Sequence, residues 1–86
     1  MMQLTIDEFK DHILTGREIE FSFNNMEYFS ELDYESYGKI FVSICTGEEK
    51  WEYIFHGTIE EFLLFKFEDK YLCQDYFSKI SFDCIL

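Results

Sequence analysis

The chain has 86 residues, and its 18 acidic against 7 basic side chains give a formal net charge of −11. That balance argues against direct binding to nucleic acid or to an anionic membrane surface, because both rely on lysine and arginine to neutralise phosphate. The length predicts one domain, residues 1–86, which buries only about 60–65% of its unfolded surface and therefore needs a dense core. Aromatic residues, 21% of the chain, can supply that core because each buries a large area.

The first element in chain order is a helix predicted over residues 6–14. Thr5 and Glu8 have the spacing of a capping box, in which each side chain satisfies the other residue's backbone N–H at the start of a helix. Gly16 follows the apolar stripe and is a natural stop. The apolar residues that recur at helical spacing are Ile6, Phe9 and Ile13. We expect this stripe to pack on a sheet formed by the residues that follow.

Residues 18–56 alternate polar and apolar side chains, which predicts four strands in an antiparallel meander. Asn24 and Asn25 suit a two-residue turn because asparagine tolerates positive φ. A three-residue loop over residues 36–38 ends in a glycine, and residues 46–49 can close the third hairpin. The registers that these three turns set therefore all place the apolar residues on the same face of the sheet.

These turns set a register, and a slip of one residue at any of them would move a whole strand's side chains to the other face. The core-facing pairs expected are Phe23–Met26, Phe21–Tyr28, Ile19–Ser30, Tyr34–Ile40, Leu32–Val42, Ile44–Trp51, Val42–Tyr53 and Ile40–Phe55. The register assigns Trp51 and Tyr53 to the core. It also requires residues 19, 21, 28, 42 and 53 to share one face, and the surface predicted below depends on that arrangement.

A second capping box, Thr58 with Glu61, predicts a helix after the meander. The apolar side of this helix would consist of Ile59, Phe62, Leu63 and Phe65. A further short helix is expected over residues 71–79, and a short terminal strand over residues 80–86, where the pattern returns to a period of two. The sequence therefore predicts an α+β fold in which an N-terminal helix and C-terminal helical segments pack on one face of a four-stranded antiparallel meander.

The opposite face of this meander is predicted to be acidic and aromatic. Glu18 should lie opposite Glu31, about 5 Å away, a like-charge pair that costs on the order of 0.2–1 kcal/mol and that folding alone does not require. The residues predicted to bind a partner are Glu18, Glu20, Phe29, Glu31, Asp33, Phe41, Glu52 and Ile54. In the alternative interpretation, the late helix or the terminal strand covers Phe29, Phe41 and Ile54 and leaves an ordinary acidic rim.

The sequence shows no catalytic constellation. His12 and His56 have no Cys or His neighbour at metal-ligand spacing, and no glycine-rich phosphate loop or activated nucleophile is present. We therefore expect no enzyme, no metal and no cofactor. Cys45, Cys73 and Cys84 are odd in number and lack CxxC spacing, which predicts free thiols in a reducing compartment. The start of the chain lacks the features of a signal peptide, so a cytoplasmic location is expected.

Three stretches resemble a group of small uncharacterised bacterial and phage-borne proteins that have a leading helix, a sheet and a closing helical segment. The stretches are residues 16–28 (GREIEFSFNNMEY), 59–63 (IEEFL) and 69–72 (DKYL). This resemblance covers about half of the chain, rests on structural residues and implies the fold alone. In size, in acidity and in the AT-rich coding that its lack of Ala and Pro indicates, the chain also resembles, in type only, phage inhibitors of host defence nucleases such as anti-CRISPR proteins.

The predicted acidic face supports two functional hypotheses. In the first, a phage or mobile-element inhibitor acts in the host cytoplasm and occupies a basic, nucleic-acid-binding surface of a defence protein, such as a nuclease or its nucleic-acid complex. Carboxylates two residues apart along a strand lie about 6.6–7 Å apart, close to the phosphate repeat, so the face would mimic a nucleic acid. In the second, the chain is an immunity-type or general protein-interaction module whose acidity serves solubility. Both hypotheses allow a monomer or a homodimer.

Overall fold

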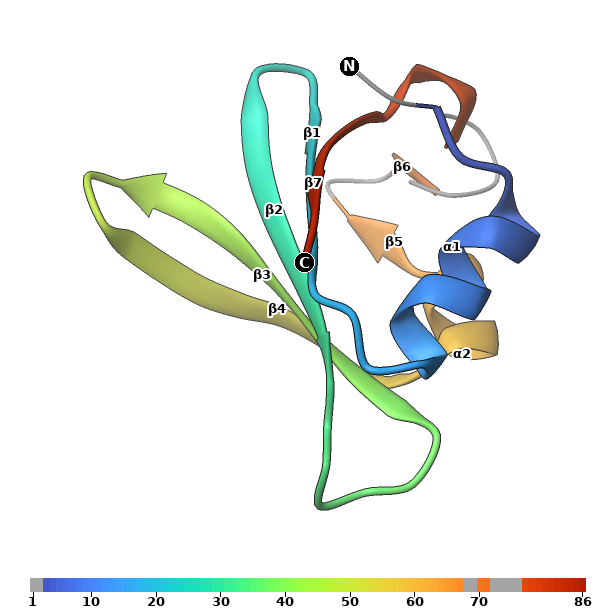
Figure 1. Ribbon diagram of the computed structural model, residues 1–86. Coiled ribbons are helices and arrows are strands. Elements are labelled where there is room, and N and C mark those ends of the chain that lie inside the picture. Colours follow the sequence, from blue (N-terminus) through green and yellow to red (C-terminus); the bar gives the residue numbers. More distant parts are fainter. Residues whose placement is uncertain (1–2, 68–69, 72–76) are drawn as a thin grey trace.

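The computed structural model of the protein describes residues 3–67, 70–71 and 77–86. In chain order the elements are α1 (Ile6–Leu14), β1 (Ile19–Phe23), β2 (Met26–Leu32), β3 (Lys39–Gly47), β4 (Lys50–Thr58), α2 (Ile59–Leu63), β5 (Lys66–Phe67), β6 (Lys70–Tyr71), the 3₁₀ turn η1 (Phe77–Lys79) and β7 (Ser81–Ile85). The five long strands form one antiparallel sheet in the order β4-β3-β2-β1-β7. Both α-helices lie on the same side of this sheet (Figure 1). The predicted α+β class is confirmed.

Helix α1 has the predicted bounds and the predicted cap. The Thr5 hydroxyl accepts the backbone N–H of Glu8 at 3.1 Å, and the Glu8 carboxylate accepts that of Thr5 at 2.9 Å. The hydrogen bond from the Thr5 backbone is the main reason that the pKa of Glu8 lies below its ordinary value. Phe9 and Ile13 are buried, whereas Ile6 is exposed, so the apolar stripe is narrower than predicted.

The β1–β2 hairpin has the predicted register. Asn24 and Asn25 both have positive φ, 53° and 63°, as a two-residue primed turn requires. Phe21 pairs with Tyr28, and their rings stack with centroids 5.0 Å apart. The turn and the alternation of the strands therefore agree, which is why this register could be predicted.

The β2–β3 register differs from the prediction by two residues. Leu32 pairs with Ile40 instead of Val42, and the connection runs over residues 33–38. The side chain of Asp33 causes the early exit, because it accepts the backbone N–H of Glu35 at 2.9 Å and bends the chain at the end of β2. A shift of two preserves the faces of β2 and β3, but it leaves Tyr34 outside the core and 80% exposed.

The β3–β4 register contains irregularities that reverse part of the predicted face. Val42 pairs with Phe55, but the next pair is Ser43 with Tyr53, so β4 carries an extra residue between the two pairs. This bulge keeps Phe55 toward the core and turns Tyr53 outward. Trp51 pairs with the half-buried Cys45 and is also outward and exposed. The prediction that Trp51 and Tyr53 belong to the core is wrong.

The shape of the sheet explains this reversal. The turn end of the β3–β4 hairpin extends away from both helices, so its inner side has no helix above it (Figure 1). An inward Trp51 or Tyr53 would gain little burial there. On the other side of the sheet, Trp51 lies edge-to-face with Phe29 and Tyr53 packs against Phe41.

The C-terminal part confirms two predictions and changes a third. Thr58 and Glu61 form the second capping box at the start of α2, and Ser81–Ile85 forms the terminal strand. That strand pairs with β1, so the sheet has five strands where a four-stranded meander was predicted. Of the helix predicted over residues 71–79, the described parts are the end of β6 and the turn η1, and residues 72–76 lie outside the described residues.

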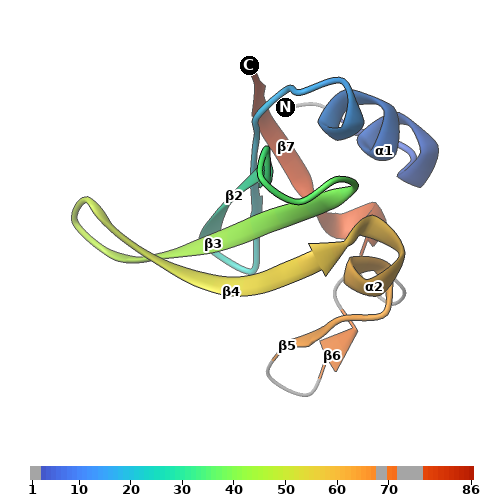
Figure 2. The same cartoon turned by 90° about the horizontal axis from the view of Figure 1, so that it is seen from below.

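The core lies between the sheet and the helices, as the view from below shows (Figure 2). Phe9 of α1 is almost completely buried at its centre, with four aromatic rings whose centroids lie 6.1–6.5 Å from its own. These rings belong to Phe21, Phe62, Phe77 and Phe82. The dense aromatic core expected from the composition is therefore present, on the side of the sheet that the helices cover (Figure 2).

Candidate functional site

The sheet face opposite α1 and α2, called the outer face below, carries no covering element among the described residues (Figures 1 and 2). The alternative prediction placed the late helix or the terminal strand over this face. Instead, β7 joins the sheet beside β1, and α2 packs on the core side. Within the described residues no element therefore covers these side chains, and residues 72–76 of the predicted late helix lie outside the described part.

The strand pairing arranges these side chains in rows that cross the sheet. One row, from β1 to β4, contains Glu20, Phe29, Ser43 and Tyr53. The next row contains Glu31, Phe41 and His56. On the other side of the first row, Cys45 of β3 pairs with Trp51 of β4. Carboxylates thus lie over β1 and β2, and aromatic rings lie over β2, β3 and β4.

The rings form an outer aromatic cluster, defined by Phe29, Phe41, Trp51, Tyr53 and His56. Phe29 and Trp51 meet edge-to-face at 6.3 Å, and the rings of Phe41 and Tyr53 lie 5.1 Å apart. The His56 ring stacks on Phe41 at 4.4 Å and 16°. Trp51 remains 45% exposed and Tyr53 70% exposed. Aromatic side chains that are packed and still exposed are typical of protein-binding surfaces, where Tyr and Trp are enriched.

A hollow of about 390 Å³ lies within this face. Its position follows from the rows, because the small side chain of Ser43 stands between the rings of Phe29 and Tyr53. The residues that line it are Glu20, Phe29, Glu31, Ser43, Trp51 and Tyr53. Aromatic walls therefore stand beside two carboxylates, and no lysine or arginine is among these lining residues.

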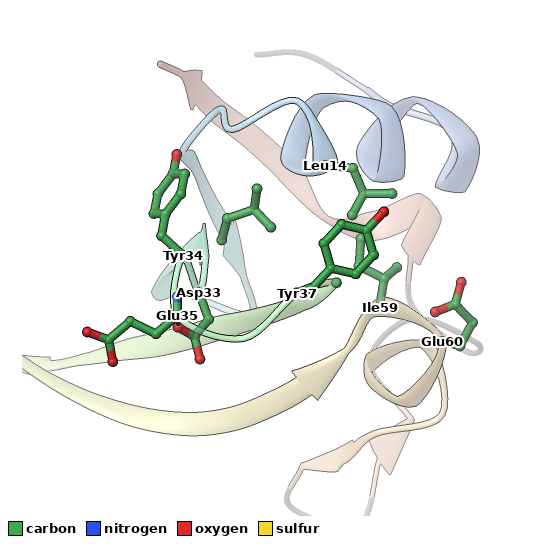
Figure 3. A pocket seen from close by; sticks show the side chains of 9 residues that line it. Leu14, Asp33, Tyr34, Glu35, Tyr37, Ile59 and Glu60 are labelled. Atoms are coloured by element: carbon green, nitrogen blue, oxygen red, sulfur yellow. Dashed lines mark hydrogen bonds between the residues drawn. The ribbon is translucent and has the colours of Figure 1, made fainter.

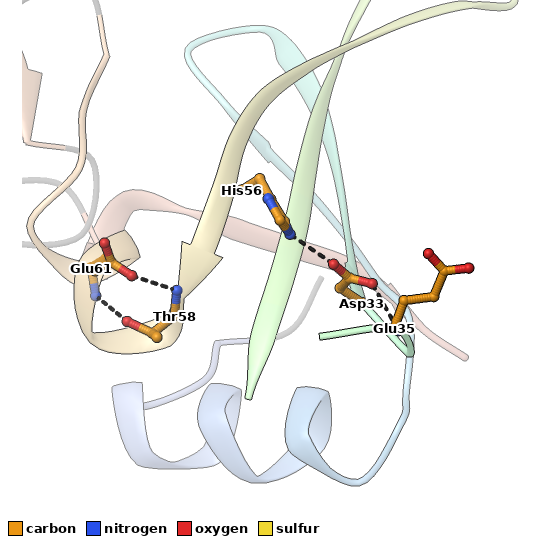
Figure 4. Close-up of polar contacts among 5 residues, drawn as sticks. All are labelled: Asp33, Glu35, His56, Thr58 and Glu61. Atoms are coloured by element: carbon orange, nitrogen blue, oxygen red, sulfur yellow. Dashed lines mark hydrogen bonds and ion pairs between the residues drawn. The ribbon is translucent and has the colours of Figure 1, made fainter. Parts of the chain in front are cut away.

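Asp33 and His56 connect the end of β2 to the outer aromatic cluster (Figure 4). The His56 Nε2 lies 2.7 Å from a carboxylate oxygen of Asp33, and the Asp33 side chain is only 10% exposed. The pKa of Asp33 lies below its ordinary value, first because the backbone N–H of Glu35 donates to its carboxylate and then because of His56. This contact holds the imidazole in place against Phe41.

The structure brings together some of the predicted binding residues and separates others. Glu20, Phe29, Glu31 and Phe41 share the outer face, and Asp33 reaches it through His56. Two other residues of the predicted set, Glu52 and Ile54, lie elsewhere. Glu18 is exposed and directly precedes β1, and its backbone carbonyl accepts the N–H of Leu86 at 2.7 Å.

Glu52 and Ile54 were assigned to the outer face by a register that is wrong for β4. Glu52 pairs with the buried Ile44 and so points to the same side as that core residue. Ile54 lies at the bulge and packs against the core. The prediction missed Trp51 and Tyr53 as outer residues, although the apolar run over residues 53–55 breaks the alternation and was a signal for a bulge.

A second hollow, of about 650 Å³, lies between the end of α1, the β2–β3 connection and the start of α2. Tyr37 stands beside Leu14 and Ile59, whereas the carboxylates of Asp33 and Glu35 point away from them (Figure 3). Asp33 is engaged by His56, and Glu60, which lies on the rim, pairs with Lys10 at 3.3 Å. The acidic side chains that line this second hollow therefore do not converge on a common point.

The described residues contain no group of three or more His, Cys, Asp and Glu side chains placed to hold a metal ion. Cys45 and Cys84 are free thiols, as predicted, and Cys73 lies outside the described residues. Within the described part of the chain, no helix has the length and apolar character needed to cross a membrane. Comparisons of the chain with protein-family models, with curated proteins and with solved structures found no match.

Proposed function

We propose that the protein is a non-enzymatic binding protein whose outer face occupies a basic, nucleic-acid-binding surface of another protein. The observation that carries this proposal is the outer face itself, which combines an exposed aromatic cluster with the carboxylates of Glu20 and Glu31. An inhibitor of a host defence protein, made by a phage or a mobile element, is the class of protein that such a surface fits.

The two kinds of side chain have different roles in this proposal. The net charge of −11 attracts a basic partner over a distance and raises the rate of encounter. Trp51 and Tyr53 then provide apolar area, whose removal from water slows dissociation. Both residues stand next to the carboxylates, so one partner surface can contact all of them.

Binding to purified nucleases and their nucleic-acid complexes, measured over a salt series, tests this function. We expect affinity to fall steeply with salt and the partner's nucleic acid to be displaced. The double substitution Glu20→Lys and Glu31→Lys should abolish binding. Its matched control, Glu48→Lys and Glu52→Lys, makes the same change in net charge at residues that do not line the hollow. Glu52 lies on the core side of β4 and Glu48 lies in the turn before that strand, so this variant should retain most of the affinity. Equal binding by both double variants would refute the proposal.

The exposure of the aromatic cluster also supports the second candidate, a protein-interaction module whose acidity serves solubility. Such a module would bind through Trp51 and Tyr53 with little dependence on salt, because apolar contacts are not screened. In the same titration, Tyr53→Ala would then weaken binding strongly, whereas the charge reversals at Glu20 and Glu31 would have a small effect. The two candidates therefore give opposite rankings of the variants.

A further inference from the structure

We infer that the hollow on the outer face receives an arginine side chain of the partner, with its guanidinium group stacked against the aromatic walls and hydrogen-bonded to Glu20, Glu31 and Ser43. This inference rests on the proposed function and names the chemical group that the outer face recognises. It follows from the lining of the hollow, from one hydroxyl that has no partner among the described residues, and from the different shapes of the arginine and lysine side chains.

The first step concerns the groups that face the hollow. Glu20 and Glu31 bring two carboxylates from neighbouring strands, at diagonal positions of the β1–β2 ladder about 7–8 Å apart. Neither carboxylate has an ion-pair or hydrogen-bond partner among the described residues. Two carboxylates that no described residue engages, beside three aromatic rings, favour a ligand that is both cationic and able to stack.

The second step concerns Ser43, which forms the floor. It is only 6% exposed, and its hydroxyl makes no hydrogen bond with any described residue. Every completely covered side-chain nitrogen or oxygen in the described part of the chain does have a partner. The Ser43 hydroxyl therefore opens onto the hollow that it lines, where it can accept a hydrogen bond from a donor that enters.

The third step distinguishes arginine from lysine. A guanidinium is planar, presents five N–H donors in a fixed fork and stacks on aromatic faces with little loss of hydration. Trp51 and Phe29 offer such faces, and the acceptors of Glu20, Glu31 and Ser43 can take donors that spread in different directions. A lysine ammonium is a compact, strongly hydrated charge that can reach one carboxylate but cannot stack flat on an aromatic ring.

Hexa-arginine and hexa-lysine peptides are suitable probes for this site. Trp51 is the only tryptophan of the chain, so its fluorescence reports directly on the hollow. We expect the arginine peptide to change this fluorescence and to bind at least about tenfold more tightly than the lysine peptide. The double variant Glu20→Gln and Glu31→Gln should lose about tenfold or more in affinity for the arginine peptide.

A matched control separates the hollow from the overall charge. Glu48→Gln with Glu52→Gln also removes two negative charges, but at residues that do not line the hollow, and it should change the affinity less than about threefold, as expected of screened surface charges. Ser43→Val fills the floor and removes the acceptor, and it should weaken arginine binding while circular dichroism confirms the fold. Equal binding of the two peptides, or equal losses in the two double variants, would overturn the inference.

These outcomes are independent of the partner titration. If the peptides fail to discriminate but a basic protein partner still requires Glu20 and Glu31, the arginine pocket is wrong and the proposed function stands. If the arginine peptide enters the hollow but every protein partner ignores the outer face, the proposed function fails while the pocket remains. If the protein binds the arginine peptide more tightly than the lysine peptide, and the Glu20→Gln and Glu31→Gln double variant no longer binds the protein partner, both the arginine pocket and the proposed function are supported.

Discussion

Replacing Tyr28 and Tyr53 one at a time by alanine tests which side of the sheet each ring occupies. Both were predicted from the alternation of the strands to face the core, but Tyr28 is 3% exposed and Tyr53 is 70% exposed. A fully buried tyrosine removes about 150–250 Å² from water, which at about 25 cal/mol per Å² stabilises the fold by about 4–6 kcal/mol. For Tyr53, with less than a third of its surface covered, the same calculation gives about 1–2 kcal/mol as an upper bound.

We therefore expect Tyr28→Ala to reduce the free energy of unfolding by about 3–5 kcal/mol, because it also leaves a cavity beside Phe21. Tyr53→Ala should cost about 1 kcal/mol or less. Urea unfolding followed by far-ultraviolet circular dichroism measures both values without relying on Trp51, whose fluorescence responds to nearby changes. Since a domain of this size is stabilised by only about 4–13 kcal/mol, the contrast is large. Equal losses in the two variants would show that the described bulge is wrong.

Two further predictions concern the turns. Asn25→Gly should stabilise the β1–β2 hairpin and raise the thermal midpoint, because Asn25 has a φ of 63° and glycine adopts that conformation at no steric cost; a lower midpoint would contradict the primed turn. Asp33→Asn should lower stability at neutral pH but not at strongly acidic pH, since the depressed pKa of Asp33 contributes stability that is present above its ordinary value of about 3.9 and is lost as the pH falls through the lower folded value. Denaturant titrations of both proteins between neutral and acidic pH measure that difference. A difference that does not change with pH would refute the stabilising role given to the Asp33 carboxylate, which accepts the backbone N–H of Glu35 and contacts His56.

The local elements could be predicted because their signals are short-range. The two capping boxes place both hydroxyl and carboxylate partners within one turn of helix, so Thr5 and Thr58 identify the starts of α1 and α2 from sequence alone. The turn at Asn24 and Asn25 likewise fixes the register of its hairpin. In each case the residues that decide the geometry are neighbours along the chain.

The candidate site was only partly predictable because its geometry depends on contacts between distant residues. The bulge beside Phe55 decides whether Tyr53 and Trp51 face the core or the outer face. The outward position is favoured because the helices do not extend over this end of the β3–β4 hairpin, where inward rings would gain little burial (Figure 1). Asp33 ends β2 early through a bond to the Glu35 backbone, which a pattern of alternation does not contain. The positions of Glu20 and Glu31 were predicted because β1 and β2 follow the regular alternation.

The bulge has a consequence for how this protein meets other chains. Strand β4 is an outermost strand of the sheet, and no other strand of the described residues pairs with its free side. The extra residue at Ile54 interrupts the regular row of backbone N–H and C=O groups along that side, which discourages an added strand from docking there. Association by sheet extension is thus disfavoured at this border, and recognition is directed to side chains on the broad surface of the sheet.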